Sequence, residues 1–192
     1  NRGACSAYGE LATGEPRLEC RFLESMSLYG ITKASGEKVI RTIAKEREID
    51  FIGFRTFGVY GPGESEQRLI PTIVRSLLAD RRAPLTQGRQ VRDFLHVDDV
   101  VNALMCEPPP GIYNLCSSIG VPVREVAVTV AECMSASIEL LGFGDLPDRL
   151  DEEEQIVGDN SKLKMNTDWA PQISLYDGIL SYTKTLIGNP TR

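Results

Sequence analysis

Tyr29 and Lys33 are the two residues of this sequence whose types and spacing best fit a chemical role. They stand four positions apart near the start of a segment, 27–47, in which apolar residues recur at close to helical spacing. On a helix this spacing places both side chains on one face, one turn apart. A phenol is a weak acid at neutral pH, and a neighbouring ammonium group favours its ionised form. The pair therefore has the composition of a proton-transfer device for an alcohol or ketone carbon, although a tyrosine and a lysine also reach this spacing by chance on many helix surfaces.

The segments that would position this pair alternate between strand and helix, which is typical of α/β architecture. After a strand end within 1–10, strands are predicted at 51–54, 93–97 and 112–115, and helices at 27–47, 69–79, from 100 onward, at 123–134 and at 174–186. A turn-rich loop is expected at 58–63 and an acidic loop at 142–159. Asp98 and Asp99 are predicted to cap the helix that begins at Val100, and Ser174 the last helix. The lone His96 is expected to be packed rather than catalytic.

The composition excludes several classes of function. A formal net charge of −6 argues against a nucleic-acid or anionic-membrane surface, because either needs a basic face. No apolar run approaches the roughly 20 residues that span a bilayer, and the start of the chain lacks a signal-peptide pattern. The five cysteines are widely spread and there is one histidine, so we expect neither a metal site nor a disulfide framework. These features predict a cytoplasmic protein with reduced cysteines.

Several ordered motifs resemble the extended short-chain dehydrogenase/reductases that act on nucleotide sugars, the NAD-dependent epimerase/dehydratases. The motifs are Tyr-Gly-Glu at 8–10, Leu-Tyr-Gly-Ile-Thr-Lys at 28–33, and the groups at 55–63, 68–71, 88–101, 113–115, 159–163 and 169–171. The resemblance implies an α/β fold in which the C-terminal part of a Rossmann-type doubly wound domain is followed by a smaller α/β substrate-binding lobe. We expect residues 1–60 to form the last elements of the dinucleotide-binding domain. Residues 61–192 would form mainly the nucleotide-sugar lobe, with about 93–105 returning to the Rossmann sheet.

The resemblance also implies the roles of the cofactor-side residues. Tyr29 would be the acid/base at the sugar carbon that undergoes hydride transfer, and Lys33 would hold the nicotinamide ribose and tune Tyr29. Thr56 would contact the cofactor, which is NAD or NADP. The family places a serine or threonine where this chain has Ala4, so Ser6 is the nearest hydroxyl that could hold the reacting group.

The substrate-side residues follow from the same resemblance. Arg92 matches the arginine that grips the substrate diphosphate, a role that suits a planar guanidinium. Alternatively, Arg92 is a structural arginine paired with Asp93. Arg149 would be the second diphosphate clamp. Four further positions match the lining of the nucleotide pocket, and the first leucine among them equally fits a plain core role: Arg68, Leu69, Leu85 and Gln87.

Three departures from the family pattern shape the expected function. No glycine-rich dinucleotide-binding motif occurs, so we expect that half of the cofactor domain to lie upstream, and the choice between NAD and NADP stays open. Cys5 and Ser6 replace the acidic residues that 4,6-dehydratases carry, which disfavours that chemistry. Gly58 stands where the family has an asparagine.

The sequence therefore predicts an NAD(P)-dependent epimerase or 4-ketoreductase acting on a nucleotide-diphosphate sugar. The alternative is a degenerate relative that binds a nucleotide or nucleotide sugar without turnover. The resemblance implies a homodimer formed through the helix that carries Tyr29. In that helix, Leu28, Ile31, Ile40 and Ile43 are expected to supply one packed face.

Overall fold

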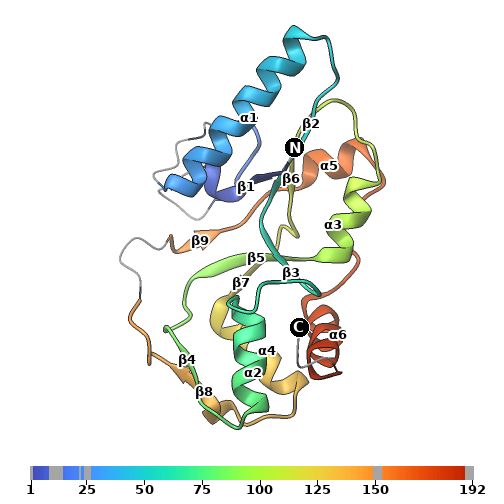
Figure 1. The fold of residues 1–192 in the computed structure, drawn as a ribbon. Coiled ribbons are helices and arrows are strands. Elements are labelled where there is room, and N and C mark those ends of the chain that lie inside the picture. Colours follow the sequence, from blue (N-terminus) through green and yellow to red (C-terminus); the bar gives the residue numbers. More distant parts are fainter. Residues whose placement is uncertain (1, 9–14, 22, 24–26, 149–152, 189–192) are drawn as a thin grey trace.

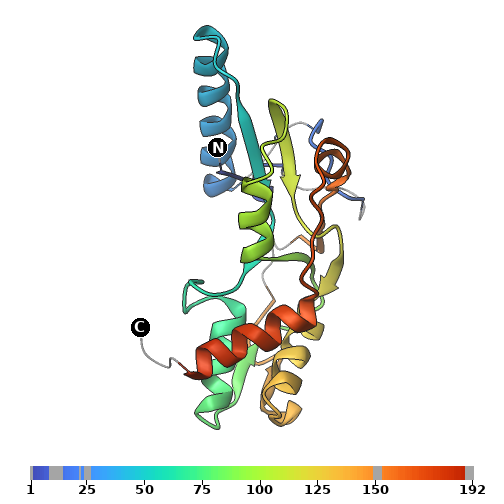
Figure 2. The ribbon, with the colours of Figure 1, turned by 90° about the vertical axis from the view of Figure 1, so that its right-hand side faces the viewer.

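The upper layer of the molecule is a parallel sheet with helices on both sides. The computed structural model describes residues 2–8, 15–21, 23, 27–148 and 153–188 (Figure 1). The sheet has the order β1-β2-β6, with β1 (Arg2–Ala4), β2 (Ile52–Thr56) and β6 (Gly111–Leu115). A short helix, η1 (Cys5–Ala7), follows β1, and α1 (Leu28–Glu46) leads into β2. Figure 2 shows α1 on one side of this sheet and α5 (Ser161–Asn166) on the other.

The lower layer is built on β5 (Val91–His96), the central strand of a second sheet. It pairs in parallel with β3 (Gly58–Tyr60) and β9 (Gln155–Ile156) and antiparallel with β7 (Gly120–Pro122). Strands β4 (Ala83–Leu85) and β8 (Leu141–Phe143) form a separate parallel pair. Helices α2 (Leu69–Leu78), α4 (Val123–Cys133) and α6 (Leu175–Gly188) pack together around the largest apolar cluster, beside the short helix η2 (Ile138–Leu140). This second core is separate from the one beneath the first sheet.

Helix α3 (Val97–Leu104) joins the two layers. It follows β5 directly, and its Val100 and Ala103 pack with Phe54 and Tyr113 of the first sheet. Residues 93–105 were expected to return to the first sheet. They contact it through α3, whereas β5 belongs to the second sheet and the third strand of the first sheet is β6. The division of the chain into two domains stays a prediction.

Two predicted loops contain strands, and one predicted helix start was wrong. Helix α3 begins at Val97 rather than Val100, because His96 Nδ1 accepts a hydrogen bond from Asp98 N at 3.2 Å and caps the helix. Asp99 is buried, and its carboxylate instead accepts from the backbone N–H groups of Gln172 and Ile173. The loop predicted at 58–63 includes β3, and the acidic loop predicted at 142–159 includes the end of β8 and all of β9. Short strands carry too little periodicity to be detected.

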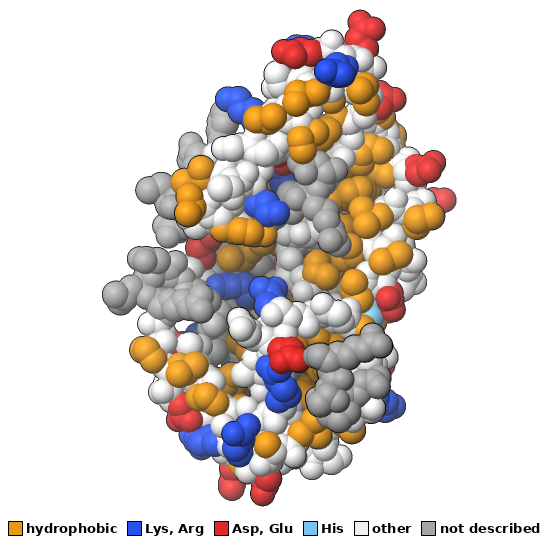
Figure 3. All heavy atoms as spheres, in the orientation of Figure 1, with side chains coloured by type: hydrophobic (Ala, Val, Ile, Leu, Met, Phe, Trp, Pro, Cys, Tyr) orange, Lys and Arg blue, Asp and Glu red, His pale blue; other side chains and the backbone are white. Residues whose placement is uncertain are grey.

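Helix α1 packs on the sheet through a face that the sequence did not indicate. Its buried residues are Gly30, Glu37 and Ala44. The apolar residues expected to form the packed face are exposed, with fractions of 79% for Leu28 and 47% for Ile43. Ile31 and Ile40 are exposed as well. Figure 3 shows hydrophobic side chains along this helix. The expectation was wrong because two small residues and an ion-paired glutamate let α1 approach the sheet closely.

The outer edge of β6 is covered by the segment around Arg17 and Glu19. Arg17 forms an isolated parallel bridge with Gly158, and Asn114 donates its backbone N–H to Glu19 Oε1 at 2.8 Å. Asn114 Nδ2 also donates to the carbonyl oxygen of Arg17 at 2.6 Å. The sheet therefore ends at β6, whereas no described strand pairs with the free side of β1. None of the described helices is both long and apolar enough to cross a membrane.

Candidate active site

The cofactor-side residues predicted from the sequence gather where the parallel strands end. Ala4 and Thr56 are register partners, and Thr56 in turn is paired with Leu115, so the three strands end at one edge. Ser6 follows β1 directly in η1, which packs against α1. Ligands of open α/β sheets bind outside the carboxyl ends of the strands. Ser6 and Thr56 therefore lie at the edge where a ligand is expected.

Tyr29 and Lys33 lie in the first turns of α1, next to this edge. Ser27 caps the helix by accepting a hydrogen bond from Gly30 N at 3.0 Å. Lys33 Nζ lies 5.4 Å from the centre of the Tyr29 ring, within the range of a cation–π contact. The Tyr29 side chain is 58% exposed. The predicted pair is thus on one helix face, as its spacing indicates, and its phenol is accessible to a ligand.

Ser6 supplies a polar group in η1, the short helix that packs against α1. Its Oγ is buried and has no hydrogen-bond partner among the described residues. A buried hydroxyl that makes no hydrogen bond lowers the stability of the fold, and a ligand that hydrogen-bonds to it removes this cost. Such a hydroxyl is available for a hydrogen bond to a ligand. The phosphate-binding glycine-rich loop of such a complex does not occur in this sequence.

A buried ion pair anchors these elements to one another. Arg55 donates to both carboxylate oxygens of Glu37, with Nη2–Oε1 at 2.7 Å and Nε–Oε2 at 2.8 Å. Its guanidinium also stacks on the Tyr8 ring, 4.7 Å from the ring centre. Burial opposes the charge of Arg55, but the hydrogen bonds to Glu37 outweigh it and raise the Arg55 pKa. Because Glu37 lies one turn after Lys33, this pair determines where the start of α1 sits relative to β2 and η1.

Arg92, the predicted diphosphate residue, lies on β5 in the lower layer. It is half-buried, and its Nη1 donates to the carbonyl oxygen of Val91 at 2.8 Å. Next to it, the buried Asp93 accepts hydrogen bonds from Ser117 N and Oγ, and from the backbone N–H groups of Ser118 and Gly158. Asp93 thus has a structural role that does not depend on Arg92. Arg149, the second predicted clamp, lies outside the described residues.

The four residues predicted for the nucleotide pocket lie in the lower layer, around the start of α2 and β4. Leu85 is buried in the lower core and Leu69 packs against that core, which is the plain core role. Arg68 precedes α2, is largely exposed and pairs with Glu64. Gln87 lies in the loop after β4, where its backbone N–H donates to Asp148 Oδ1 at 3.1 Å.

One further residue next to Gln87 was missed from the sequence. The Arg124 guanidinium lies 3.7 Å from the centre of the Phe143 ring, and its Nε donates to the Gln87 carbonyl at 3.2 Å. This combination of a cation, an aromatic ring and an amide can receive a planar or anionic ligand. It depends on the pairing of β4 with β8, which no local pattern predicts.

Comparison with known proteins matches the chain to one family. The model of the NAD dependent epimerase/dehydratase family matches residues 1–116. CDP-abequose synthase of Salmonella typhimurium strain LT2 is 31% identical over 172 residues, covering 85% of this chain and 57% of that protein.

Solved structures share the fold. The NAD complex of dTDP-glucose 4,6-dehydratase from Bacillus anthracis matches 98% of this chain and 61% of its own, with a TM-score of 0.89 and 23% identity. The NAD complex of UDP-glucose 4-epimerase from Thermus thermophilus matches 97% of this chain and 63% of its own, with a TM-score of 0.86 and 24% identity. A Pseudomonas aeruginosa structure with a TM-score of 0.83 and 23% identity, covering 96% of this chain and 65% of its own, holds NADPH. The chain thus has a Rossmann-type α/β fold and spans about three fifths of the length of these proteins.

Proposed function

The chain belongs to the NAD-dependent epimerase/dehydratase family, and we propose that it carries the acid/base part of an epimerase or 4-ketoreductase acting on a nucleotide-diphosphate sugar. The observation that carries the proposal is the accessible Tyr29–Lys33 pair at the start of α1, near the carboxyl ends of the strands. The Ser6 hydroxyl of the adjoining η1 has no hydrogen-bond partner among the described residues. NAD or NADP, when bound, would accept a hydride from the sugar carbon or return one to it. CDP-abequose synthase, by its name, makes a nucleotide-linked sugar, which supports this substrate class.

In this proposal one residue transfers the proton and the others bind the cofactor or the reacting oxygen. Tyr29 takes the proton of the sugar hydroxyl during oxidation and gives it back during reduction. Lys33 stabilises the phenolate through its positive charge and binds the nicotinamide ribose. Ser6 donates a hydrogen bond to the reacting oxygen, and Thr56 contacts the cofactor from the end of β2.

The substrate side is proposed to use the lower layer. Arg92 and Arg149 would bind the diphosphate, and Arg68, Leu69, Leu85 and Gln87 would surround the nucleotide. The family resemblance implies that these residues contact one ligand, and the packing of Leu69 and Leu85 against the same core is compatible with this arrangement.

The identity of the residue before Ser6 supports an epimerase or reductase over a dehydratase. Elimination of water from the sugar needs an additional acid and base near the reacting carbons. Burial raises the pKa of Cys5 to about 11, so its thiol remains protonated and is a poor acid or base near neutral pH. Ser6 does not ionise in this range.

Tyr29→Phe in the full-length protein tests the assignment. The expected result is a loss of kcat of at least about 100-fold, because a positioned acid/base contributes 10²–10⁴-fold, with nucleotide-sugar affinity within about twofold. Steady-state kinetics and calorimetry measure the two quantities. Tyr176→Phe, which removes an exposed hydroxyl on α6, is the matched control.

Unchanged turnover in the Tyr29→Phe protein would disprove the catalytic role. If the wild-type protein binds the nucleotide sugar but forms no NADH, keto sugar or epimer, the non-catalytic alternative is correct.

A further inference from the structure

A cleft of about 1390 Å³ runs along α1 in the upper layer, between this helix and residues 18–21 and Leu23. Its lining extends from Ile31, near Tyr29, past the buried Glu37–Arg55 pair to the residues that lead into β2 and β6. Because the strands are parallel, these last residues lie at their amino ends, whereas Ser6 and Thr56 mark the carboxyl ends. The part of the cleft around Lys45 and Phe51 therefore lies away from Tyr29.

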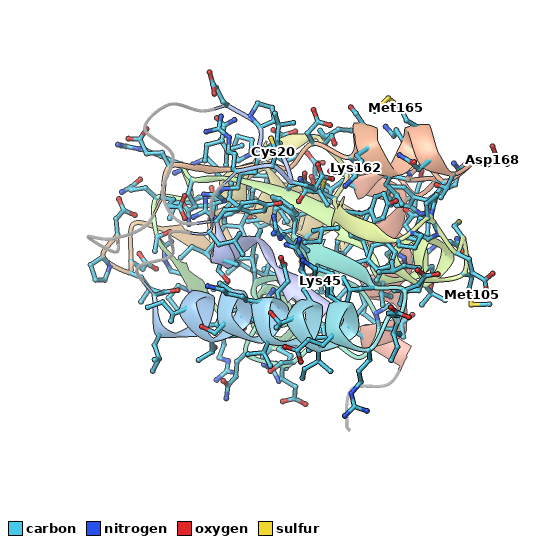
Figure 4. The ribbon with its side chains drawn as sticks, turned by 90° about the horizontal axis from the view of Figure 1, so that it is seen from above. Cys20, Lys45, Met105, Lys162, Met165 and Asp168 are labelled. Atoms are coloured by element: carbon cyan, nitrogen blue, oxygen red, sulfur yellow. The ribbon has the colours of Figure 1, made fainter. Side chains whose placement is uncertain are left out.

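Three basic residues of α1 line this cleft in a row. Lys38, Arg41 and Lys45 are spaced by three and four positions, so they share one helix face and extend over roughly 10 Å. Lys162 of α5 lies across the cleft from them. Figure 4 shows Lys45 on the side of α1 toward the sheet, with Lys162 and Cys20 opposite. A row of positive charges of this length matches a polyphosphate chain.

The acidic residues that line the cleft are mostly engaged elsewhere. Glu37 is occupied by its two hydrogen bonds from Arg55. Glu19 accepts from the backbone N–H of Asn114. Asp50 is the remaining carboxylate of the lining. The balance of available charge in the cleft is therefore positive, in a chain whose formal net charge is −6.

The floor of the cleft is apolar and includes one aromatic ring. A Cβ atom added to Gly53 would lie 2.9 Å from Phe51 Cε1, so the Phe51 ring packs directly over the glycine. The ring is half-buried, and Ile49 beside it is 59% exposed and Ile31 46%. A planar aromatic ligand can stack on such a ring and cover the neighbouring aliphatic groups.

We propose that this cleft binds a nucleotide polyphosphate, with the base on Phe51 and the phosphates along Lys38, Arg41 and Lys45. Guanidinium and ammonium groups form charge-assisted hydrogen bonds with phosphate, and stacking on Phe51 supplies the apolar part of the affinity. Lys45 and Phe51 lie at the amino ends of the strands, and Tyr29 lies near the carboxyl ends, so we expect the two ligands to bind at the same time. The site is in addition to the nucleotide-sugar site and does not depend on the proposed catalytic function.

Calorimetry with ATP as the probe tests this site in the full-length protein. The protein is first saturated with NAD and a nucleotide sugar, so that the active site is occupied. ATP is expected to bind with one site per chain, and the double variant Arg41→Ala/Lys45→Ala is expected to weaken its affinity at least about tenfold, since two charge-assisted contacts are removed. Arg47→Ala, which removes a charge just beyond the end of α1 and outside the cleft lining, should change the affinity by less than about twofold.

Pyrophosphate and adenosine, titrated separately, distinguish the two halves of the site. Each is expected to bind more weakly than ATP. Pyrophosphate as tight as ATP would overturn the assignment of a stacked base. Absence of ATP binding to the saturated wild-type protein, or an affinity that the double variant does not change, would overturn the site itself. Circular dichroism of the variants verifies that they are folded, which is expected because both side chains are exposed.

Discussion

At the residue scale, Asp93 has a structural role next to Arg92, the residue that we propose binds the substrate diphosphate. Its carboxylate accepts hydrogen bonds from residues after β6 and after β9, while the residue itself belongs to β5. Burial raises the pKa of Asp93, and the hydrogen bonds from Ser117, Gly158 and Ser118 oppose that shift. The neighbouring Arg92 therefore lies on a strand that is hydrogen-bonded to the segments after β6 and after β9.

Gly58 is explained by close contact between two strands. A Cβ atom at this position would lie 2.4 Å from the Asp93 carbonyl oxygen, a distance that backbone atoms cannot accommodate without a shift of β3 or β5. The asparagine expected from the family resemblance therefore does not fit this backbone. The glycine is a packing requirement here.

We predict that Gly58→Asn lowers the free energy of unfolding by about 1–3 kcal/mol, because the new side chain forces the two strands apart. Urea denaturation followed by circular dichroism measures the change. Gly36→Ala is the matched control, since no atom lies within 4 Å of the added Cβ and alanine favours the helix by about 0.5–1 kcal/mol. Equal stability of Gly58→Asn and wild type would show that the strands separate without cost.

The cysteines should differ in reactivity according to burial. Burial raises the pKa of Cys5 to about 11, and burial together with the Asp93 carboxylate raises the pKa of Cys116 further. Cys20 and Cys106 are exposed. Because the thiolate is the reactive form, we expect iodoacetamide at pH 8 to modify Cys20 and Cys106 at least about tenfold faster than Cys5 and Cys116.

Mass spectrometry of time points measures the order of alkylation. The reaction of Cys5 should accelerate as the pH rises toward 11, since more of its thiol ionises. In 8 M urea, Cys5, Cys20, Cys106 and Cys116 should react at similar rates, and this measurement serves as the control. Modification of Cys116 as fast as that of Cys20 in the native protein would contradict the structure around it.

At the element scale, α1 combines a buried charge with an apolar outer surface. Glu37 and Arg55 are both only 4% exposed at their side chains. Removing one partner of such a pair leaves an uncompensated buried charge, whereas the intact pair adds little net stability over apolar residues. The pair therefore contributes more to the position of α1 than to overall stability.

We expect Glu37→Gln to lower the free energy of unfolding by about 3 kcal/mol, because Arg55 keeps its charge without a counterion. The double variant Glu37→Met/Arg55→Met should recover most of this loss. Urea titrations of the single and double variants measure both effects. A Glu37→Gln protein as stable as wild type would mean that water or another residue compensates Arg55.

The sequence predicted where the helices begin and end better than it predicted which of their faces are buried. Helices with long periodic segments, such as α1, α2 and α4, end within a few residues of the prediction, and Ser174 does accept a hydrogen bond from Asp177 N as a cap. The buried side of α1 could not be predicted, because its contact residues are a glycine, an alanine and a charged glutamate.

The residues of the candidate site were predicted in two ways. Tyr29 and Lys33 are local in sequence, so their spacing already places them on one helix face, whereas Thr56 and Ser6 were predicted from the family resemblance alone. The Arg124–Phe143 contact depends on a pairing between strands more than 50 residues apart, which leaves no local signal.

At the scale of the whole molecule, the outer face of α1 is an exposed apolar surface. Val39, Ile40 and Ile43 are 56%, 43% and 47% exposed, and Leu28 lies on the same side. Exposed apolar patches of this kind mark interaction surfaces. We propose that this face forms the interface of a homodimer.

Ile43→Lys is expected to convert the dimer of the full-length protein to a monomer, because a charge placed in an apolar interface must be desolvated. Sedimentation velocity at several protein concentrations measures the change. Met105→Lys is the matched control, since Met105 is 77% exposed and lies at the end of α3. A wild-type protein that sediments as a monomer, or an Ile43→Lys protein that remains a dimer, would refute the interface.

The covering of β6 by Glu19 has a consequence for self-association. An uncovered edge strand offers its N–H and C=O groups to any other strand, and this is a route to aggregation. Here a carboxylate oxygen of Glu19 accepts the backbone N–H of Asn114, and that N–H is no longer available to a strand from another chain. Among the described strands, the side of β1 away from β2 has no such cover. We therefore expect any strand added to the upper sheet to pair with β1 in preference to β6.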